Sequence, residues 1–354
     1  MDRSDEIRAQ IVAAYENRSA LAIRGGGSKS FYGRPVAASR TLELGGHQGI
    51  LEYEPKELYI CARAGTPLSE IEAVLAQRGQ ILAFEAPHFS PHATLGGCVA
   101  SGLSGPRRPY AGAVRDHVLG VRMLNGRGED LRFGGKVMKN VAGYDVSRLL
   151  AGSLGSLGVL LEVTCKVLPR PVATRSLAFD MSAAAALEQL VTWSLRPSPI
   201  SAAAHDGERL YLRLEGAASR VENFARAVGG DLLADDVGDR FWEDLREQRL
   251  PFFAGTAPLW RLALPAGSPP VPESFGTVFY DWGGQQGWLR GPLDAPALRA
   301  WAARQGGHAT AFRHPPDDAV FQDLPPALLA LQQRLKAAFD PAGILNPGRF
   351  YPGL

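Results

Sequence analysis

Three consecutive glycines, Gly25 to Gly27, follow a short apolar stretch at residues 21–23 and restrict the possible folds of this chain. Glycine lacks a Cβ atom, so the run can adopt positive φ angles and turn several main-chain N–H groups toward one concavity. This pattern predicts a phosphate-binding loop, with a plain glycine-rich turn as the alternative. No glycine directly precedes a Lys-Ser pair, which excludes a Walker A motif, and Gly33 and Pro35 disfavour the helix that a Rossmann fingerprint requires.

The residues around this loop predict a compact α/β lobe over residues 1–80. Ser4 is expected to cap a helix in which Ile7, Ile11 and Tyr15 recur every four residues. Apolar stretches at 41–44 and 58–64 predict strands, and the Thr66-Pro67 pair predicts the start of a second helix as its cap and first residue.

The next segment is unusually poor in side-chain volume. Thr94 is expected to cap a short helix that contains Gly96, Gly97 and Ala100, with Gly102 following. Such a helix suits a planar ligand lying against the main chain, or tight packing on a neighbouring strand, and the segment alone does not decide between them. A hairpin is predicted from strands at 117–124 and 130–133 around an Asn-Gly turn.

Prolines 169 and 171 follow a predicted strand at 159–168 and indicate a domain boundary. From about 172 to 312, strand-like and helical stretches alternate, which predicts an α+β cap domain. The strand-like stretches are 176–179, 210–214, 259–264, 277–281 and 308–312, and the helical ones are 183–195, 219–228, 239–249 and 295–304. A helix is expected at 326–339, followed by a tail that hugs the surface. With 354 residues, of which 45% are hydrophobic, the chain is expected to form two domains.

Composition removes several function classes. The net charge of +2 and the scattered Lys and Arg residues disfavour nucleic acid as a partner. No apolar stretch approaches the length of a membrane span, and the charged N-terminal residues disfavour a signal peptide, so no direct membrane insertion and a cytoplasmic location are expected. Cys61, Cys98 and Cys165 lie far apart, which argues against a disulfide framework, zinc or an iron–sulfur cluster and suggests core positions.

Several motifs together resemble one family, the vanillyl-alcohol-oxidase (PCMH-type) flavoproteins. They are the loop at 24–33, the small-residue segment at 94–121, KNVAGYD at 139–145, GSLGSLGV at 152–159 and FDPAGILNPGRF at 339–350. Within the family, GPRRPYAGAVRDHVLG, FGGKVMKNVAGYDVSRL, LWRLALP and YDWGG are most similar to the FAD-binding E subunits of glycolate oxidases. The resemblance implies an α+β fold with a two-lobed FAD domain at 1–170 (lobes of about 1–80 and 81–170), a cap at 171–318, and a C-terminal segment at 319–354 that returns to the FAD domain.

The resemblance also implies which residues hold the cofactor. Residues 24–30 would bind the FAD pyrophosphate, residues 94–101 would line the flavin, Arg115 and Asp116 would lie near it, and Gly158-Val159 would contact the adenine side. The implied cofactor-binding residues are Arg24, Gly25, Gly26, Gly27, Ser28, Lys29, Ser30, Gly33, Pro87, Thr94, Gly96, Gly97, Ala100, Ser101, Arg115, Asp116, Val118, Gly158 and Val159. Relatives with covalent flavin carry a histidine where this chain has Ser28, so non-covalent FAD is expected.

Residues for the chemistry itself are harder to find, and the catalytic residues stay unknown. Flavin-dependent oxidation of a 2-hydroxy acid needs a cation for the carboxylate and a base for the hydroxyl proton. Catalytic relatives share an H-x-H pair, and none of the seven histidines here forms one. His88 and His92 flank the predicted flavin segment, but each is more often a loop histidine. His314, before Pro-Pro-Asp-Asp, is expected to lie in a solvated loop, with a metal site as the alternative, and no metal is expected.

Four cationic residues are further candidates beside the histidines. Arg107-Arg108 is expected to be a surface or subunit contact. Lys139 or Arg115 would stabilise reduced flavin, with a structural ion pair as the alternative.

Three hypotheses follow from intact cofactor motifs beside a missing substrate set. In the first, the chain binds FAD within a glycolate oxidase complex, beside a catalytic flavoprotein sister and an iron–sulfur subunit, and relays electrons or supports assembly; the small 2-hydroxy acid reaches the complex rather than this chain. In the second, the chain is an autonomous 2-hydroxy-acid dehydrogenase that uses His314 or His88 with Arg107 or Arg108. In the third, it is a structural pseudo-flavoprotein without FAD. The resemblance allows a membrane association only through partners.

Overall fold

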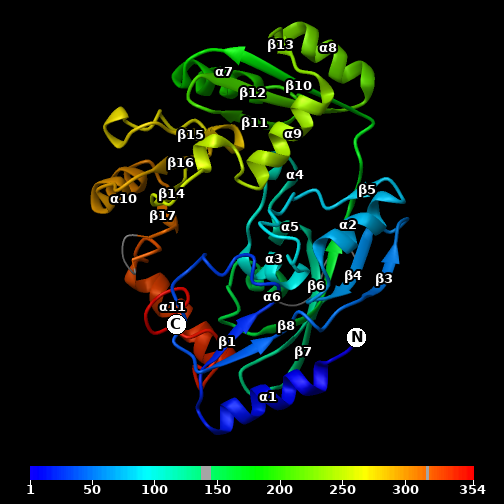
Figure 1. Cartoon of the computed structure of the whole chain (residues 1–354), viewed down its shortest axis with the longest axis vertical. Helices are drawn as coiled ribbons and strands as arrows, with labels where there is room; N and C mark the ends of the chain where they lie inside the picture. The colour runs from blue at the N-terminus through cyan, green and yellow to red at the C-terminus, as the bar shows by residue number, and fades with distance from the viewer. Residues whose placement is uncertain (137–144, 316–318) are drawn as a thin grey trace. The chain divides into compact units, whose positions relative to one another are not determined.

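A computed structural model describes residues 1–136, 145–315 and 319–354 of the chain. Its elements are helices mixed with largely antiparallel sheets (Figure 1), which confirms the α+β class. The chain divides into two compact units, one of residues 1–104, 112–169 and 323–354 and the other of residues 105–111 and 170–322. Among the described residues, no helix combines the length and the apolar character needed to cross a bilayer.

The first unit contains a five-stranded antiparallel sheet in the order β3-β4-β8-β6-β7 and a separate parallel pair, β1-β2. Its helices are α1 (Ser4–Glu16), α2 (Leu68–Ala76), α3 (Leu95–Ser101), α5 (Val114–His117), α6 (Val146–Leu150) and α11 (Pro326–Phe339). Its strands are β1 (Leu21–Arg24), β2 (Arg40–Glu43), β3 (Ile50–Glu54), β4 (Tyr59–Arg63), β5 (Gln80–Ile81), β6 (Val118–Leu124), β7 (Asp130–Gly134), β8 (Val159–Lys166) and β9 (Leu168–Pro169).

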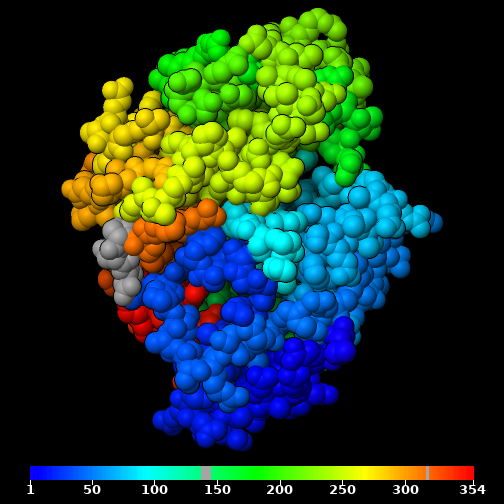
Figure 2. All heavy atoms as spheres, viewed as in Figure 1, coloured from blue at the N-terminus to red at the C-terminus, as the bar shows by residue number. Residues whose placement is uncertain are grey.

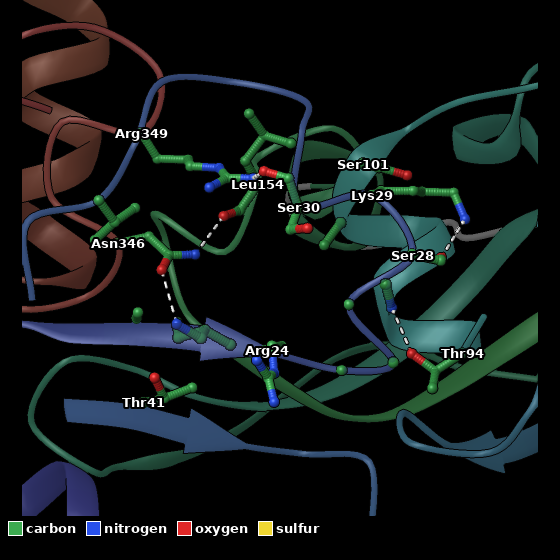
Figure 3. A pocket seen from close by; sticks show the side chains of 18 residues that line it. Arg24, Ser28, Lys29, Ser30, Thr41, Thr94, Ser101, Leu154, Asn346 and Arg349 are labelled. Atoms are coloured by element: carbon green, nitrogen blue, oxygen red, sulfur yellow. Dashed lines mark hydrogen bonds between the residues drawn. The ribbon is translucent and has the colours of Figure 1, made fainter. Parts of the chain in front are cut away.

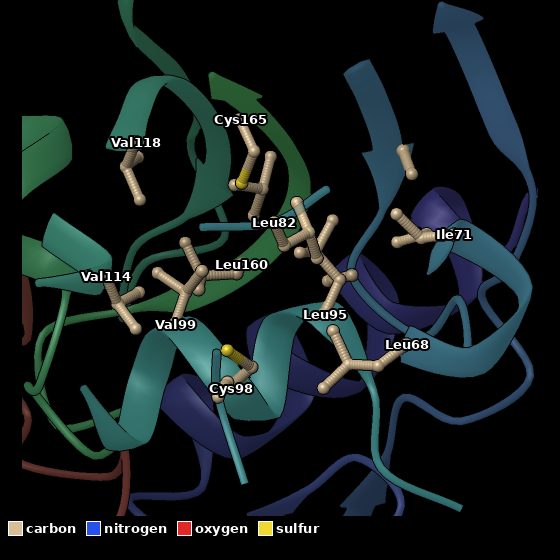
Figure 4. Packing of buried hydrophobic residues seen from close by; sticks show 14 of the residues in the cluster. Leu68, Ile71, Leu82, Leu95, Cys98, Val99, Val114, Val118, Leu160 and Cys165 are labelled. Atoms are coloured by element: carbon tan, nitrogen blue, oxygen red, sulfur yellow. The ribbon is translucent and has the colours of Figure 1, made fainter. Parts of the chain in front are cut away.

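The main core of this unit lies between the sheet and helices α2 and α3. Leu68, Ile71 and Leu75 recur at helical spacing, so α2 turns one apolar face inward. Leu95, Cys98 and Val99 do the same for α3 (Figure 4), and all three are fully buried. Each large apolar side chain buried in this way contributes about 1.5–3 kcal/mol to stability, so the core fixes α3 firmly beside the sheet.

The two ends of the chain meet at a second core of the first unit. Ile7 and Ile11 of α1 are buried together with Leu21 of β1 and with Ile344 and Leu345 near the C-terminus. The main chain of Leu21 donates from its N–H to the Ile344 carbonyl at 2.8 Å and pairs with Leu345 in a parallel bridge. The C-terminal segment therefore lies against β1, the strand that leads into the glycine loop.

Helix starts differ slightly from the sequence expectation. Ser4 begins α1 rather than preceding it, with Arg3 in the cap position, and Pro67 rather than Thr66 precedes α2. Thr66 is instead fully buried and accepts a hydrogen bond from the Gly49 N–H on its side-chain oxygen. Its side chain therefore bonds to the main chain of Gly49, and α2 begins without a side-chain cap.

The second unit is built on an eight-stranded sheet in the order β13-β10-β12-β11-β15-β16-β14-β17, in which every recorded pair is antiparallel. Its helices are α4 (Arg108–Ala111), α7 (Ala183–Ser194), α8 (Ala218–Val228), α9 (Asp235–Arg246) and α10 (Ala295–Arg304), with single turns η1 (Pro251–Phe253), η2 (Glu273–Phe275) and η3 (Trp282–Gly284). Its strands are β10 (Ala173–Asp180), β11 (Ile200–His205), β12 (Arg209–Gly216), β13 (Asp231–Leu232), β14 (Leu259–Ala263), β15 (Phe279–Asp281), β16 (Gln286–Arg290) and β17 (His308–Arg313).

Candidate functional site

The glycine loop borders a cavity of about 310 Å³ that lies within the first unit. In Figure 2 the surface is hollowed among the blue N-terminal residues, and red atoms of the C-terminal segment are visible inside the hollow. Figure 3 shows the cavity from close by. Its lining comprises Ala22, Ile23, Arg24, Gly25, Gly26, Gly27, Ser28, Lys29, Ser30, Val36, Thr41, Thr94, Gly97, Ala100, Ser101, Leu154, Asn346 and Arg349.

The loop can take this path only because its residues lack side chains. A Cβ atom on Gly26 would lie 1.5 Å from the carbonyl oxygen of His92, and one on Gly25 would lie 2.5 Å from Thr94 Oγ1. Gly27 has a φ of +72°, which favours glycine. The glycine run therefore rests directly on the segment that leads into α3, and residues 25–30 and 94–101 share one cavity as the loop interpretation requires.

The loop presents hydrogen-bond donors to the cavity. Within the described structure, the main-chain N–H groups of Gly25, Gly26, Gly27 and Ser28 donate to no protein acceptor. These four residues are half-buried, and four successive N–H groups without a protein acceptor at a cavity indicate a place for a ligand that supplies acceptor atoms.

The charged side chains that line the cavity are all cationic. Arg24, Lys29 and Arg349 line it, and its lining includes no Asp or Glu. Arg24 pairs with Glu43 of the adjacent strand at 3.0 Å, and the Lys29 ammonium donates to Ser28 Oγ at 3.3 Å and to the His88 carbonyl at 3.4 Å. Donors and cations together favour an anion in this cavity.

Helix α3 supplies the opposite wall, and its small residues serve two purposes. The Thr94 side chain accepts a hydrogen bond from the Gly97 N–H at 3.2 Å, which confirms the predicted cap. A Cβ on Gly96 would lie 2.6 Å from that of Ala64, so Gly96 is needed for packing. Gly97 and Ala100 line the cavity instead. The packing interpretation is therefore confirmed at Gly96, and the ligand interpretation stays a prediction, for which Gly97 and Ala100 lie at the cavity.

A second cavity, of about 80 Å³, continues the first toward β8. The two share Ile23, Gly25, Thr94, Gly97, Ala100, Leu154 and Asn346 in their linings. The second is also lined by Leu44, Ala64, Gly96, Ser153, Gly155, Gly158 and Leu160. A Cβ on Gly158 would lie 1.9 Å from Met123 Cε, so this glycine also allows the wall to pack closely. The joined space has a polar, cationic end at the loop and a more apolar end at β8.

Sequence reasoning assigned no role to individual residues of the C-terminal segment, although two of them line the site. Asn346 is buried, accepts the Ile23 N–H at 2.8 Å and donates to the Leu154 carbonyl at 2.7 Å. Arg349 donates to the carbonyls of Ser30 at 2.9 Å and Tyr32 at 2.6 Å. The motif at 339–350 was the available signal, but only the folded chain shows which of its side chains reach the loop.

Other predicted cofactor residues lie outside both linings. Val118 and Val159 are buried in the apolar cores, and Pro87 is buried as well. Arg115 is exposed, with its side chain 3.9 Å from Asp116, whose carboxylate accepts the Ala113 N–H. Gly33 contacts the site indirectly, because a Cβ there would lie 3.0 Å from Arg349 Nε.

The candidates for chemistry are engaged elsewhere. His88 Nε2 lies 3.1 Å from Glu72 Oε1. Arg107 was expected at the surface or a subunit contact, but it is largely buried and donates to Glu215 of β12 at 2.8 Å, within the second unit. Arg108 is placed over the Trp282 ring at 4.3 Å from its centre.

Metal-binding and thiol chemistry find no support in the part of the chain that the structure describes. It contains no cluster of three or more His, Cys, Asp or Glu side chains that could hold a metal ion. All three cysteines are buried and free, and burial raises the pKa of Cys98 to about 12. Lys139 and the Pro316–Asp318 part of the His314 motif lie outside the described residues.

The site can be tested for its fit to FAD from these observations alone. FAD combines a dianionic pyrophosphate with two flat ring systems. Unbonded N–H groups and cations at one end of the cavity suit the pyrophosphate, and the wall of small residues at Gly97 and Ala100 suits a ring. The residues present therefore fit the group.

Comparison with known proteins agrees with this fit. A family model described as an FAD binding domain matches residues 2–134, and one described as the C-terminal domain of FAD linked oxidases matches residues 317–350. The chain is 45% identical over 353 residues to glycolate oxidase subunit GlcE of Escherichia coli (strain K12), covering 100% of this chain and 99% of that protein.

More distant relatives share parts of the chain or its fold. Glycolate oxidase subunit GlcD of Bacillus subtilis (strain 168) is 29% identical over 175 residues, which cover 49% of this chain and 37% of that protein. Among solved structures, p-cresol methylhydroxylase with substrate bound is 16% identical with a TM-score of 0.74, over 99% of this chain and 87% of that one. Alkyldihydroxyacetonephosphate synthase has a TM-score of 0.68 at 16% identity, over 97% of this chain and 74% of that one. These two structures show the fold.

Proposed function

Because this chain belongs to the PCMH-type FAD-binding family and is homologous over its whole length to glycolate oxidase subunit GlcE, we propose that it is the FAD-binding subunit of a glycolate-oxidising complex. The proposal gives FAD one position, the joined cavities of the first unit. When bound, FAD supplies the electron-accepting ring, and the residues of this chain supply its binding and orientation.

The observation that supports this position is the row of unbonded N–H groups from Gly25 to Ser28, in a cavity lined by cations and no carboxylate. In the proposal these groups and Lys29 hold the pyrophosphate. Thr94, Gly97, Ala100 and Ser101 hold the flavin face, and Gly158 lies on the adenine side. The FAD-binding domain then comprises residues 1–170 and 319–354, and the cap comprises 171–318.

We further propose that the FAD is held without a covalent bond. Ser28 lines the cavity where covalently flavinylated relatives would have a histidine, and a serine hydroxyl offers no comparable attachment to the flavin ring. Denaturation of the purified protein should therefore release the flavin completely.

In this proposal the chain is not the main site of glycolate oxidation. It lacks an H-x-H pair, and His88 and Arg107, two candidates for substrate chemistry, are engaged with Glu72 and Glu215. Its flavin relays electrons, or supports assembly, beside a catalytic flavoprotein subunit and an iron–sulfur subunit. The complex is cytoplasmic in the proposal and reaches a membrane only through partners.

The experiment is to record the flavin absorbance of the purified chain, alone and co-expressed with its partner subunits, before and after anaerobic addition of glycolate. We expect a yellow protein whose flavin is bleached by glycolate only in the complex. Bleaching in the isolated chain would contradict the non-catalytic role and favour the autonomous dehydrogenase. A colourless chain that cannot be reconstituted with FAD would contradict the proposal as a whole.

A further inference from the structure

Arg349 occupies an unusual electrostatic position in the candidate site. Its side chain comes from the C-terminal segment and reaches the loop at residues 28–34 (Figure 3). There the guanidinium donates to the Ser30 and Tyr32 carbonyls, while the Arg349 carbonyl accepts the Arg34 N–H at 2.9 Å. The contact is therefore made in both directions, and it ties the loop to a segment more than three hundred residues away.

The loop has been shaped to admit this side chain. Gly33 has a φ of +91°, and a Cβ atom at that position would lie 3.0 Å from Arg349 Nε and 3.1 Å from the Arg349 carbonyl. Gly33 is thus required for the approach of Arg349, which explains a predicted site residue that lies outside the cavity lining.

The positive charge of Arg349 is not neutralised by the protein. No carboxylate of the described residues lies within ion-pair distance of its guanidinium, and its recorded partners are neutral carbonyls. Arg24, the other arginine of the cavity, pairs with Glu43. Burial lowers the pKa of Arg349, as expected for a cation withdrawn from water without a counter-charge. A cavity with such a group is prepared for an anionic ligand.

The segment that precedes Arg349 is held in place by buried hydrogen bonds. The Lys336 ammonium is buried and bonds to Asp340, to the Ser156 carbonyl and to the Leu345 carbonyl at 2.7–2.8 Å. Asp340 also accepts the N–H groups of Ile344 and Leu345. This turn, followed by the two hydrogen bonds of Asn346, leaves Arg349 little freedom to move away from the loop.

We propose that Arg349 is the counter-charge for the pyrophosphate of the bound dinucleotide and that it sets the conformation of the phosphate loop. The inference rests on the proposed function, because it assigns a residue to the FAD site. It makes the C-terminal segment part of the cofactor site, so that the loop alone does not hold the dinucleotide.

The test compares Arg349→Met, which removes the charge, and Arg349→Lys, which keeps it, with the wild-type full-length chain. FAD affinity is measured by fluorescence titration at several salt concentrations, and ADP and adenosine are titrated as competitors. A charge-assisted contact predicts a loss in FAD and ADP affinity on the order of ten- to a hundredfold for Arg349→Met, a smaller loss for Arg349→Lys, and no change for adenosine. The salt dependence of FAD binding should also weaken in Arg349→Met.

Arg78→Met serves as the matched control, because Arg78 is exposed in the same unit and lines neither cavity. Equal affinities of wild type and Arg349→Met for FAD and ADP would overturn the inference while leaving the proposed function intact. An equal loss for adenosine and ADP would also overturn it, since the role would then be packing alone. If the wild-type chain binds no FAD, the proposed function itself fails. Should Arg349→Met not fold, Arg349→Lys with the ADP and adenosine titrations decides the question.

Discussion

Two cations of the C-terminal segment differ in whether the protein supplies a counter-charge: the buried Lys336 and the half-buried Arg349. Lys336 lies against the carboxylate of Asp340, and all its recorded contacts are with the protein. Arg349 has only carbonyl partners and faces a cavity. A charge that the protein neutralises serves its structure, whereas a charge left without a counter-ion beside a cavity serves a ligand. The comparison therefore assigns Lys336 a structural role in this segment and Arg349 a role in ligand binding.

The largest expected effect on stability comes from removing the Lys336 partner of the buried Lys336–Asp340 ion pair. Lys336→Met leaves Asp340 buried without its cation, and loss of one partner of a buried pair costs about 3–5 kcal/mol. The free energy of unfolding, measured by denaturant titration, should fall by that amount. Arg334→Met on the exposed face of the same helix is the control and should change it by less than about 0.5 kcal/mol. Equal effects of the two variants would show that the Lys336 contacts contribute nothing special.

The packing of the glycine loop beside the cavity is disrupted most directly by a substitution at Gly26. Gly26→Ala places a methyl group 1.5 Å from the His92 carbonyl oxygen, so the loop must move away from α3. We expect a loss of about 1–3 kcal/mol in the free energy of unfolding and a loss of bound FAD. Gly135→Ala is the control, because a Cβ there meets no atom within 4 Å. Normal FAD content in Gly26→Ala would contradict the close packing of the loop on the segment before α3.

Asn346 lies in sequence between the Lys336–Asp340 pair and Arg349, and its side chain lines the cavity. Variants at this position therefore test stability and FAD binding together. Asn346→Ala removes the acceptor for Ile23 and the donor to Leu154, both part of the cavity wall, at a cost of about 1–3 kcal/mol in stability. Asn346→Asp keeps the acceptor but adds a carboxylate to a lining that has none. Thermal unfolding should show a loss of stability in both variants, because neither side chain can donate to the Leu154 carbonyl. FAD titration should show the weaker affinity for the aspartate variant, and an equal or stronger affinity for that variant would argue against an anion in the cavity.

The smallest effect is expected from His47, a buried ring whose two nitrogen atoms both have partners within the protein. Its Nδ1 accepts the Arg3 N–H at 3.0 Å and its Nε2 lies 3.1 Å from the Leu161 carbonyl, so the neutral form satisfies both atoms. Burial lowers the pKa of His47 in the folded protein. The unfolded chain then binds the proton more readily, so this contribution to stability is present at neutral pH and is lost as the pH falls below about 6.5.

The measurement is the melting temperature of wild type and His47→Gln across pH 5 to 8. The wild-type advantage should shrink toward acid pH. A constant difference between the two proteins would contradict the assignment of the neutral ring.

Local sequence signals predicted much of this fold. The cap at Thr94 and the helices at 295–304 and 326–339 were placed correctly, because each follows from spacing and capping within a few residues. β11 was missed because its Ala202–Ala204 centre has low strand propensity, and it forms only because β12 and β15 flank it. β3 was missed because it is an edge strand that carries Glu52 and Glu54.

The residues of the candidate site also differ in whether local sequence could identify them. The glycine loop and the small-residue helix were recognisable from their own composition. The roles of Asn346 and Arg349 depend on contacts across more than three hundred residues, which no local pattern encodes. Arg107 was misjudged for a similar reason, since its partner Glu215 lies on a distant strand.

The central claim is tested most directly by titrating the purified wild-type chain with FAD while following its thermal unfolding. The account predicts a melting temperature that rises with FAD concentration, as for any ligand that binds only the folded state, and complete release of the flavin on denaturation. A melting temperature that is independent of FAD, in a protein that also carries no flavin as purified, would contradict it.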